Sequence, residues 1–301
     1  MTALDGLTVD VPRGLVGLVG ANGAGKTTLF RLLLGLARPT EGSVDVCGRS
    51  VAADPVGSRA RLGYMPEHDC LPLDQSAADV VATLGELSGL PARAARQRAS
   101  EVLDLVGLDE ARFRPVGGFS TGMRQRVKLA QSLVADPELA LLDEPTAGLD
   151  PTGREEMLVL VGRLASFGIS VLLATHLLDD VARVCDHVVM LDAGRLVVAG
   201  PTETLLHQTG KLTVEVNAGV GRLARVLAER GLTVVNDEPL DADGEGGSVD
   251  VVVGPDPGPV LDTIRDVLAD LGLPLHRLSS RAASLDEAFV ADRGAAGTGW
   301  R

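Results

Sequence analysis

The sequence is short of aromatic residues, lysine and cysteine. Aromatic side chains make up 2% of its 301 residues, so a core of this size must be aliphatic. Its three cysteines, Cys47, Cys70 and Cys185, are scattered without a CxxC pair, which argues against a disulfide framework and against a zinc site. Three of the 28 basic residues are lysines, and we attribute the excess of arginine to coding bias rather than to function.

The sequence also lacks long apolar runs, a basic leader and a positive charge balance. No uninterrupted apolar run approaches the roughly 18 residues of a membrane span, and residues 1–7 carry no basic segment of a signal peptide. The net charge of −13 disfavours a nucleic-acid partner, because an acidic surface repels phosphate backbones. We therefore expect a soluble protein that binds no nucleic acid and that depends on a partner for any role at a membrane.

Short apolar strands alternate with helices over residues 1–209. This order predicts an α/β fold with an open, mostly parallel sheet, interrupted by a helical insertion at about residues 68–130. We expect a hairpin turn at Ala193 and Gly194. The predicted strands are 16–19, 43–47, 62–65, 139–142 and 169–175, and the predicted helices are 26–37, 76–108 (broken at Gly89), 122–135, 154–166 and 178–184.

The pattern changes over residues 210–292, where strands and helices follow the order βαββαβ. That order predicts a small α+β domain with the ferredoxin-like arrangement. An acidic, glycine-rich loop at 237–247 is expected to be solvated, and residues 293–301 to form a disordered tail. The predicted strands are 212–216, 232–235, 249–253 and 275–278, and the predicted helices are 221–230 and 260–271.

A glycine-rich loop, G-A-N-G-A-G-K-T, follows the first strand and opens the first helix. It matches GxxxxGK[ST], in which backbone N–H groups cradle phosphate oxygens at a helix N-terminus. Lys26 would reach the β- and γ-phosphates of ATP, and the Thr27 hydroxyl would ligate Mg²⁺. In a chain with 36 glycines such a match can arise by chance, but the flanking strand and helix favour a phosphate site. The candidate residues are Gly20, Ala21, Asn22, Gly23, Ala24, Gly25, Lys26, Thr27 and Thr28.

Two further strands end in residues that suit ATP hydrolysis. Asp143 would hold Mg²⁺, and Glu144 would orient and deprotonate the attacking water. Two carboxylates after an apolar strand are usually only a solvated strand end, but their pairing with the phosphate loop reverses that interpretation. His176 follows strand 169–175 and could be a structural residue. Because parallel strands end at one edge, we expect it near the γ-phosphate.

A third motif, F-S-T-G-M at residues 119–123, lies between the phosphate loop and L-L-D-E-P-T-A-G-L-D at 141–150. With these motifs, residues 4–206 resemble the ATP-binding subunit of an ABC transporter. The resemblance implies a head-to-tail homodimer that sandwiches two ATP molecules. It places Asp150 on the loop that crosses the dimer interface and makes His176 the switch histidine. The residues it assigns to the signature motif, which faces ATP on the opposite subunit, are Ser120, Thr121, Gly122 and Met123.

The signature variant and the C-terminal domain resemble a narrower group, the ATPase subunits of ABC-2-type exporters. The segment 284–290, S-L-D-E-A-F-V, is similar to the one that closes those proteins, although it also fits an amphipathic helix over the small sheet. The resemblance implies an ATPase that drives a separate transmembrane permease. We expect a helix of that permease to dock near residues 67–81.

The chain departs from the family pattern at two places. No aromatic residue precedes Phe30 to stack on adenine, so either an upstream segment is absent from this sequence or adenine is held otherwise. We expect weak nucleotide affinity or loose base selectivity. Glu67 stands where the family more often has glutamine. A carboxylate there would ligate Mg²⁺, and the alternative is an exposed loop residue.

Two other functions compete with transport. One is an ABC-type ATPase that acts on ribosomes or DNA, but such proteins usually carry two cassettes, a long coiled coil or basic patches, and this sequence shows none of these. The other is a P-loop kinase or metabolic ATPase, which would leave the F-S-T-G-M motif without a role.

Overall fold

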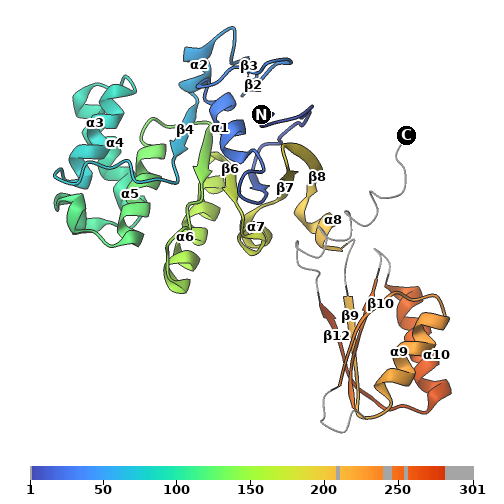
Figure 1. The fold of residues 1–301 in the computed structure, drawn as a ribbon. Helices are drawn as coiled ribbons and strands as arrows, with labels where there is room; N and C mark the ends of the chain where they lie inside the picture. Colours follow the sequence, from blue (N-terminus) through green and yellow to red (C-terminus); the bar gives the residue numbers. More distant parts are fainter. Residues whose placement is uncertain (1, 208–210, 240–245, 254–256, 282–301) are drawn as a thin grey trace. The chain divides into compact units, whose positions relative to one another are not determined.

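The computed structural model describes residues 2–207, 211–239, 246–253 and 257–281 (Figure 1). Backbone contacts divide the chain into two compact units, Met1–Pro201 and Thr202–Arg301. No helix among the described residues is long and apolar enough to cross a membrane.

The first unit is built on a six-stranded sheet with the order β4-β5-β6-β1-β7-β8. Five strands are parallel and the edge strand β8 is antiparallel to β7, so the predicted α/β fold and the hairpin at Ala193 and Gly194 are confirmed. The strands are β1 (Leu15–Val19), β4 (Leu62–Met65), β5 (Leu139–Asp143), β6 (Ser170–Thr175), β7 (His187–Asp192) and β8 (Arg195–Pro201).

Two predicted elements are shorter in the structure. The expected strand 43–47 reduces to β2 (Asp45–Val46), paired with β3 (Arg49–Ser50), because Cys47 and Gly48 take φ angles of 49° and 75° and turn the chain. The first helix, α1 (Lys26–Leu33), ends before the expected residue 37 because Gly35 takes a φ of 66°, a left-handed conformation common just after helix ends.

Helices pack closely on the sheet where small residues allow it. A Cβ atom on Gly63 of β4 would overlap the Ser132 carbonyl oxygen on α5 (Thr121–Leu133), so the helix backbone rests directly on this strand. Figure 1 shows α3, α4 and α5 grouped on the β4 side of the sheet. The remaining helices of this unit are α2 (Pro55–Arg59), α3 (Ala77–Leu87), α4 (Ala92–Leu105), α6 (Pro151–Leu164) and α7 (Leu178–Val184), with short 3₁₀ turns at Asp109–Phe113, Val116–Gly118 and Ala165–Phe167.

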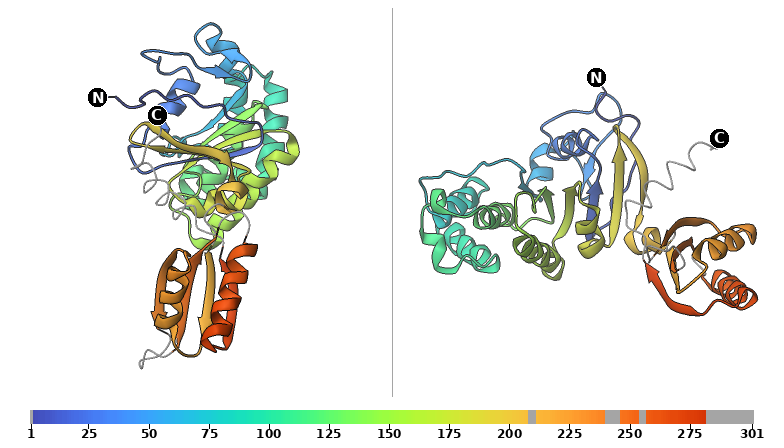
Figure 2. Two further views of the ribbon diagram at one scale, coloured as in Figure 1. Left: turned by 90° about the vertical axis from the view of Figure 1, so that its right-hand side faces the viewer. Right: turned by 60° about the horizontal axis from the view of Figure 1, so that its bottom comes forward.

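The second unit has a four-stranded sheet with the order β10-β11-β9-β12. Its neighbouring strands are antiparallel, and both long helices lie against one face, as Figures 1 and 2 show, so the ferredoxin-like arrangement is confirmed. The elements are α8 (Thr202–His207), β9 (Lys211–Val216), α9 (Val220–Glu229), β10 (Val234–Pro239), β11 (Gly247–Val252), α10 (Gly258–Leu271) and β12 (Leu275–Arg281).

The loop expected at 237–247 is shorter than predicted. Pairing of Glu238 with Ser248 and of Pro239 with Gly247 carries both strands into this segment. The segment 284–290 and the tail 293–301 lie outside the described residues.

Candidate functional site

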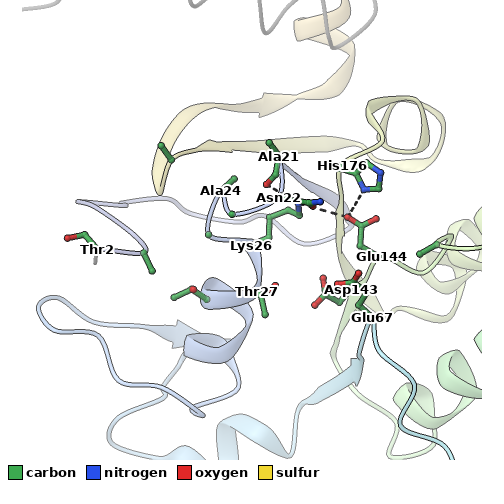
Figure 3. A pocket seen from close by; sticks show the side chains of 16 residues that line it. Thr2, Ala21, Asn22, Ala24, Lys26, Thr27, Glu67, Asp143, Glu144 and His176 are labelled. Carbon is green, nitrogen blue, oxygen red and sulfur yellow. Dashed lines mark hydrogen bonds and ion pairs between the residues drawn. The ribbon is translucent and has the colours of Figure 1, made fainter.

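A cavity of about 600 Å³ opens where β1, β5 and β6 end (Figure 3). It brings together most of the predicted site residues, from four separate parts of the chain. Gly20 lies directly before the cavity-lining loop. The lining residues are Thr2, Ala3, Ala21, Asn22, Gly23, Ala24, Gly25, Lys26, Thr27, Thr28, Glu67, Asp143, Glu144, Ala147, His176 and Ala193.

The glycine-rich loop turns its backbone toward this cavity. Gly23 and Gly25 take φ angles of 85° and 107°, which residues with a side chain rarely adopt. Gly25 is the N-cap of α1 and supplies no side-chain cap, so the first N–H groups of the helix stay open to a ligand. A helix N-terminus with free N–H groups favours an anion such as phosphate.

Lys26 places a buried cation over this loop. Its side chain is 8% exposed, and its Nζ donates to the Gly20 carbonyl oxygen at 2.5 Å. The same Nζ lies 4.0 Å from Oε1 of Glu144. The ammonium group therefore stands between the loop and the carboxylates, in the position that phosphate oxygens would require.

Glu144 is held in an unusual backbone conformation directly after β5. Its φ is 48°, and its N–H donates to the Ala174 carbonyl oxygen of β6 at 2.9 Å. Strained residues of this kind cluster at functional sites. The carboxylate lies 2.9 Å from Nδ1 of His176 and accepts a hydrogen bond from Thr175 at 3.4 Å. Figure 3 shows Lys26, Glu144 and His176 converging, as expected for strands that end at one edge.

Asp143 and Glu67 form a second pair of carboxylates beside Thr27. Burial, reinforced by the charges of Glu67 and Glu144, raises the pKa of Asp143 to about 6. Such a pair is stabilised by a cation, and hydroxyl and carboxylate oxygens are the ligands that Mg²⁺ prefers. Across the residues that the structure describes, no group of three or more histidine, cysteine or acidic side chains forms a complete metal site. The donor set therefore fits a Mg²⁺ ion that takes its other ligands from phosphate and water.

The predicted signature residues lie outside the cavity. Ser120 caps the N-terminus of α5, where its Oγ accepts a hydrogen bond from the Met123 N–H at 3.3 Å, and Thr121 and Gly122 form the first turn. Asp150 likewise caps α6, accepting from the Gly153 N–H at 2.8 Å. Within one chain the structure thus leaves these five predicted residues, Met123 included, apart from the others.

The comparisons with known proteins agree with this geometry. A family model described as "ABC transporter" matches residues 4–147. The Nod factor export ATP-binding protein I of Ralstonia nicotianae is 34% identical, in an alignment covering 96% of this chain and 88% of that protein. The chain belongs to the ABC transporter family. The predicted family and the ATPase activity are thereby confirmed.

A second relative and a solved structure are also ABC proteins. The daunorubicin resistance ATP-binding protein DrrA3 of Streptomyces coeruleorubidus is 36% identical over 96% of this chain and 90% of its own. Among solved structures, cbiO1 of Clostridium perfringens, titled as part of the ABC transporter complex cbiONQ, superposes with a TM-score of 0.61. It is 29% identical and covers 67% of this chain and 82% of that one. The cassette fold is therefore shared with solved ABC ATPases.

Two contacts of this ABC ATPase were not predicted from the sequence. Buried Asp180 accepts from the Thr146 hydroxyl at 2.7 Å and from Nε of Arg154 at 2.6 Å, and so holds the loop after Glu144. Lys128, on α5, is 2% exposed and donates to the Glu67 carbonyl oxygen at 2.7 Å. No sequence signal marks either residue, because Lys128 lies among the polar residues of α5 and Asp180 is one of two adjacent aspartates in α7.

Proposed function

We propose that this ABC ATPase dimerises around two Mg²⁺-ATP and drives a separate transmembrane permease in export, at the cytoplasmic face of the membrane. The observation that carries the proposal is the convergence of Lys26, Glu144 and His176 at one cavity. Phosphate binding and water activation are the two requirements of ATP hydrolysis, and these residues supply both.

The chain's own residues divide the chemistry between binding and proton transfer. The loop N–H groups and Lys26 bind the β- and γ-phosphates of ATP. Thr27, Asp143 and Glu67 would hold Mg²⁺, which neutralises charge on the phosphates when bound. Glu144 accepts the proton of the attacking water, and His176 holds that carboxylate in place through the 2.9 Å contact.

A second copy of the chain would complete the site. Ser120 and Gly122 begin α5 outside the cavity of their own chain, at the N-terminus of a 13-residue helix. Such a terminus attracts anions, so it suits the γ-phosphate held by the partner copy. Asp150 begins α6 in the same way and would lie at the interface between the copies.

The permease contact is proposed for residues 67–81. Leu73 in this segment is 58% exposed and lies among acidic residues such as Asp69 and Asp74, a mixture that suits a protein contact. The names of two relatives, a Nod factor export protein and a daunorubicin resistance protein, favour export. Co-purification of the tagged chain from membranes should recover a polytopic protein, and recovery of ribosomes or DNA instead would contradict this partner.

The mechanism is tested by Glu144→Gln, with Glu86→Gln on the exposed surface of α3 as the matched control. Glutamine keeps the shape of the side chain but cannot accept the proton, so we expect ATP binding without hydrolysis and accumulation of a dimer. Light scattering after size-exclusion chromatography measures the dimer. A monomer at saturating ATP would contradict the two-copy site, and Lys26→Ala should abolish ATP binding itself.

A further inference from the structure

Lys128 is a buried lysine in the middle of α5, far along the helix from the signature residues at its start. Its side chain is 2% exposed, although lysine is almost never fully buried without a partner. The partner is the backbone carbonyl oxygen of Glu67, which accepts from Nζ at 2.7 Å. This buried ammonium group lies on a side of α5 that also carries Gln125, Gln131 and Ser132, and its hydrogen bond to Glu67 is the specific contact that it makes.

That contact joins α5 to the segment that carries Glu67 into the nucleotide cavity. Glu67 lies two residues beyond the end of β4, where the strand pairing has stopped. One turn further along α5, Nε2 of Gln131 lies 3.5 Å from Sγ of Cys70. The same face of the helix thus holds residues 67–70 at two points.

The position of this segment decides where the Glu67 carboxylate lies. Figure 3 shows Glu67 beside Asp143 among the residues that line the cavity, and of the charged groups around Asp143 it is Glu67 that raises the pKa of Asp143 most. Two carboxylates can share one Mg²⁺ only when both are held within ligand distance, roughly 2.0–2.1 Å from the ion. A small displacement of the Glu67 backbone would remove its carboxylate from that arrangement.

We propose that Lys128 is a positioning residue for the ATPase site: by holding the Glu67 carbonyl, it fixes the Glu67 carboxylate beside Asp143 for Mg²⁺. The inference rests on the proposed role of Glu67 as a Mg²⁺ ligand. It is separate from the packing of the helix, because α5 already rests on β4 through the close approach of Ser132 to Gly63.

A structural role and a positioning role predict opposite results for Lys128→Met. Methionine fills a similar volume without charge, and replacing a buried ion by an apolar residue is often neutral or stabilising. We therefore expect the melting temperature to stay the same or rise, while Mg²⁺ binds more weakly. Loss of a group that orients a metal ligand typically lowers metal affinity by about 10–100-fold.

The experiment uses the full chain with Glu144→Gln, so that ATP is not turned over. Binding of a fluorescent ATP analogue is titrated with Mg²⁺, and binding without Mg²⁺ is measured in EDTA. Lys128→Met should raise the Mg²⁺ midpoint at least about tenfold and leave binding in EDTA unchanged. Lys211→Met, the same replacement in β9 of the second unit, is the control and should leave the midpoint unchanged.

A double-mutant cycle shows whether Lys128 acts through Glu67. With Glu67→Ala already present, Lys128→Met should cause no further shift of the Mg²⁺ midpoint. The inference would be overturned if Lys128→Met shifted the Mg²⁺ midpoint equally with and without Glu67→Ala, or if it caused no shift in the chain that keeps Glu67. A lower melting temperature together with lost binding in EDTA would also overturn it. If Glu67→Ala itself leaves the midpoint unchanged, the proposed role of Glu67 fails and the inference fails with it.

Discussion

Replacing Asp180 by asparagine should destabilise the cassette, because this carboxylate is buried between two hydrogen-bond donors. Asp180 is 1% exposed and binds the Thr146 hydroxyl at 2.7 Å and Nε of Arg154 at 2.6 Å. Asparagine keeps the shape but removes the charge. Its amide oxygen can still accept from Arg154 while its amide nitrogen donates to the Thr146 hydroxyl, so the main loss is the charge that strengthens the contact with Arg154.

The expected loss of unfolding free energy follows from the burial of Asp180 and Arg154. Removing one partner of a fully buried ion pair costs about 3–5 kcal/mol. The Arg154 side chain is 32% exposed, so its guanidinium group can recover hydration, and one charged hydrogen bond is worth about 1.5–3 kcal/mol. We therefore expect the free energy of unfolding to fall by about 2–3 kcal/mol, which for a unit of this size lowers the melting temperature by about 4–12 °C.

Scanning calorimetry of the full chain measures this loss, and the cassette transition is the one that ATP shifts upward. Asp179→Asn, the same change at an exposed neighbouring position, is the control and should move the transition by less than about 0.5 kcal/mol. Because Thr146 lies between Glu144 and Asp150, ATP hydrolysis should fall further than ATP binding. A destabilisation no larger than that of Asp179→Asn would refute the reasoning.

Four further results are expected. Glu67→Gln should change the Mg²⁺ dependence of ATP hydrolysis and leave ATP binding largely intact; an identical Mg²⁺ titration would exclude Glu67 as a ligand. Because the pKa of Asp143 is raised to about 6, protons should compete with Mg²⁺, so the Mg²⁺ midpoint should rise about tenfold for each pH unit below 6. The pKa of Asp143 in the folded protein lies above its unfolded value near 3.8. Ionisation of Asp143 therefore lowers the free energy of unfolding as the pH rises through 6. Gly63→Ala should prevent folding of the cassette, since its Cβ would collide with the backbone of α5, whereas Gly162→Ala, which meets nothing within 4 Å, should leave the melting temperature unchanged or higher. Finally, ATP should bind weakly and with little preference over GTP, because none of the described residues that line the cavity is aromatic; micromolar binding with a clear preference for ATP would contradict this.

The sequence predicts the residues of the cavity well because they belong to local patterns. The loop from Gly20 to Thr27 and the strand that ends at Asp143 are continuous motifs. The rule that parallel strands end at one edge placed His176 near them. None of this required knowledge of which strands are neighbours.

The remaining features depend on contacts between distant segments, which a linear pattern does not encode. The hydrogen bond from Thr175 to Glu144 exists because β5 and β6 are adjacent. The ties of Asp180 to Thr146 and of Lys128 to Glu67 span 34 and 61 positions of sequence. Even the end of strand 43–47 was set by two left-handed residues, Cys47 and Gly48, rather than by hydrophobicity.

The pairing of β5, β6 and β1 limits which amino-acid substitutions this site can tolerate. Asp143 lies opposite Ala174, and Val19 opposite Thr175, so the last paired positions of the three strands fall in two successive rows, and Gly20, Glu144 and His176 come directly after them. Sliding one strand by a single residue would move its terminal side chain by about 3.3 Å and turn it to the other face of the sheet. The aliphatic residues that hold these strands in register therefore determine the positions of the catalytic groups. Substitutions in those strands, which touch no nucleotide, should be constrained as tightly as the carboxylates themselves.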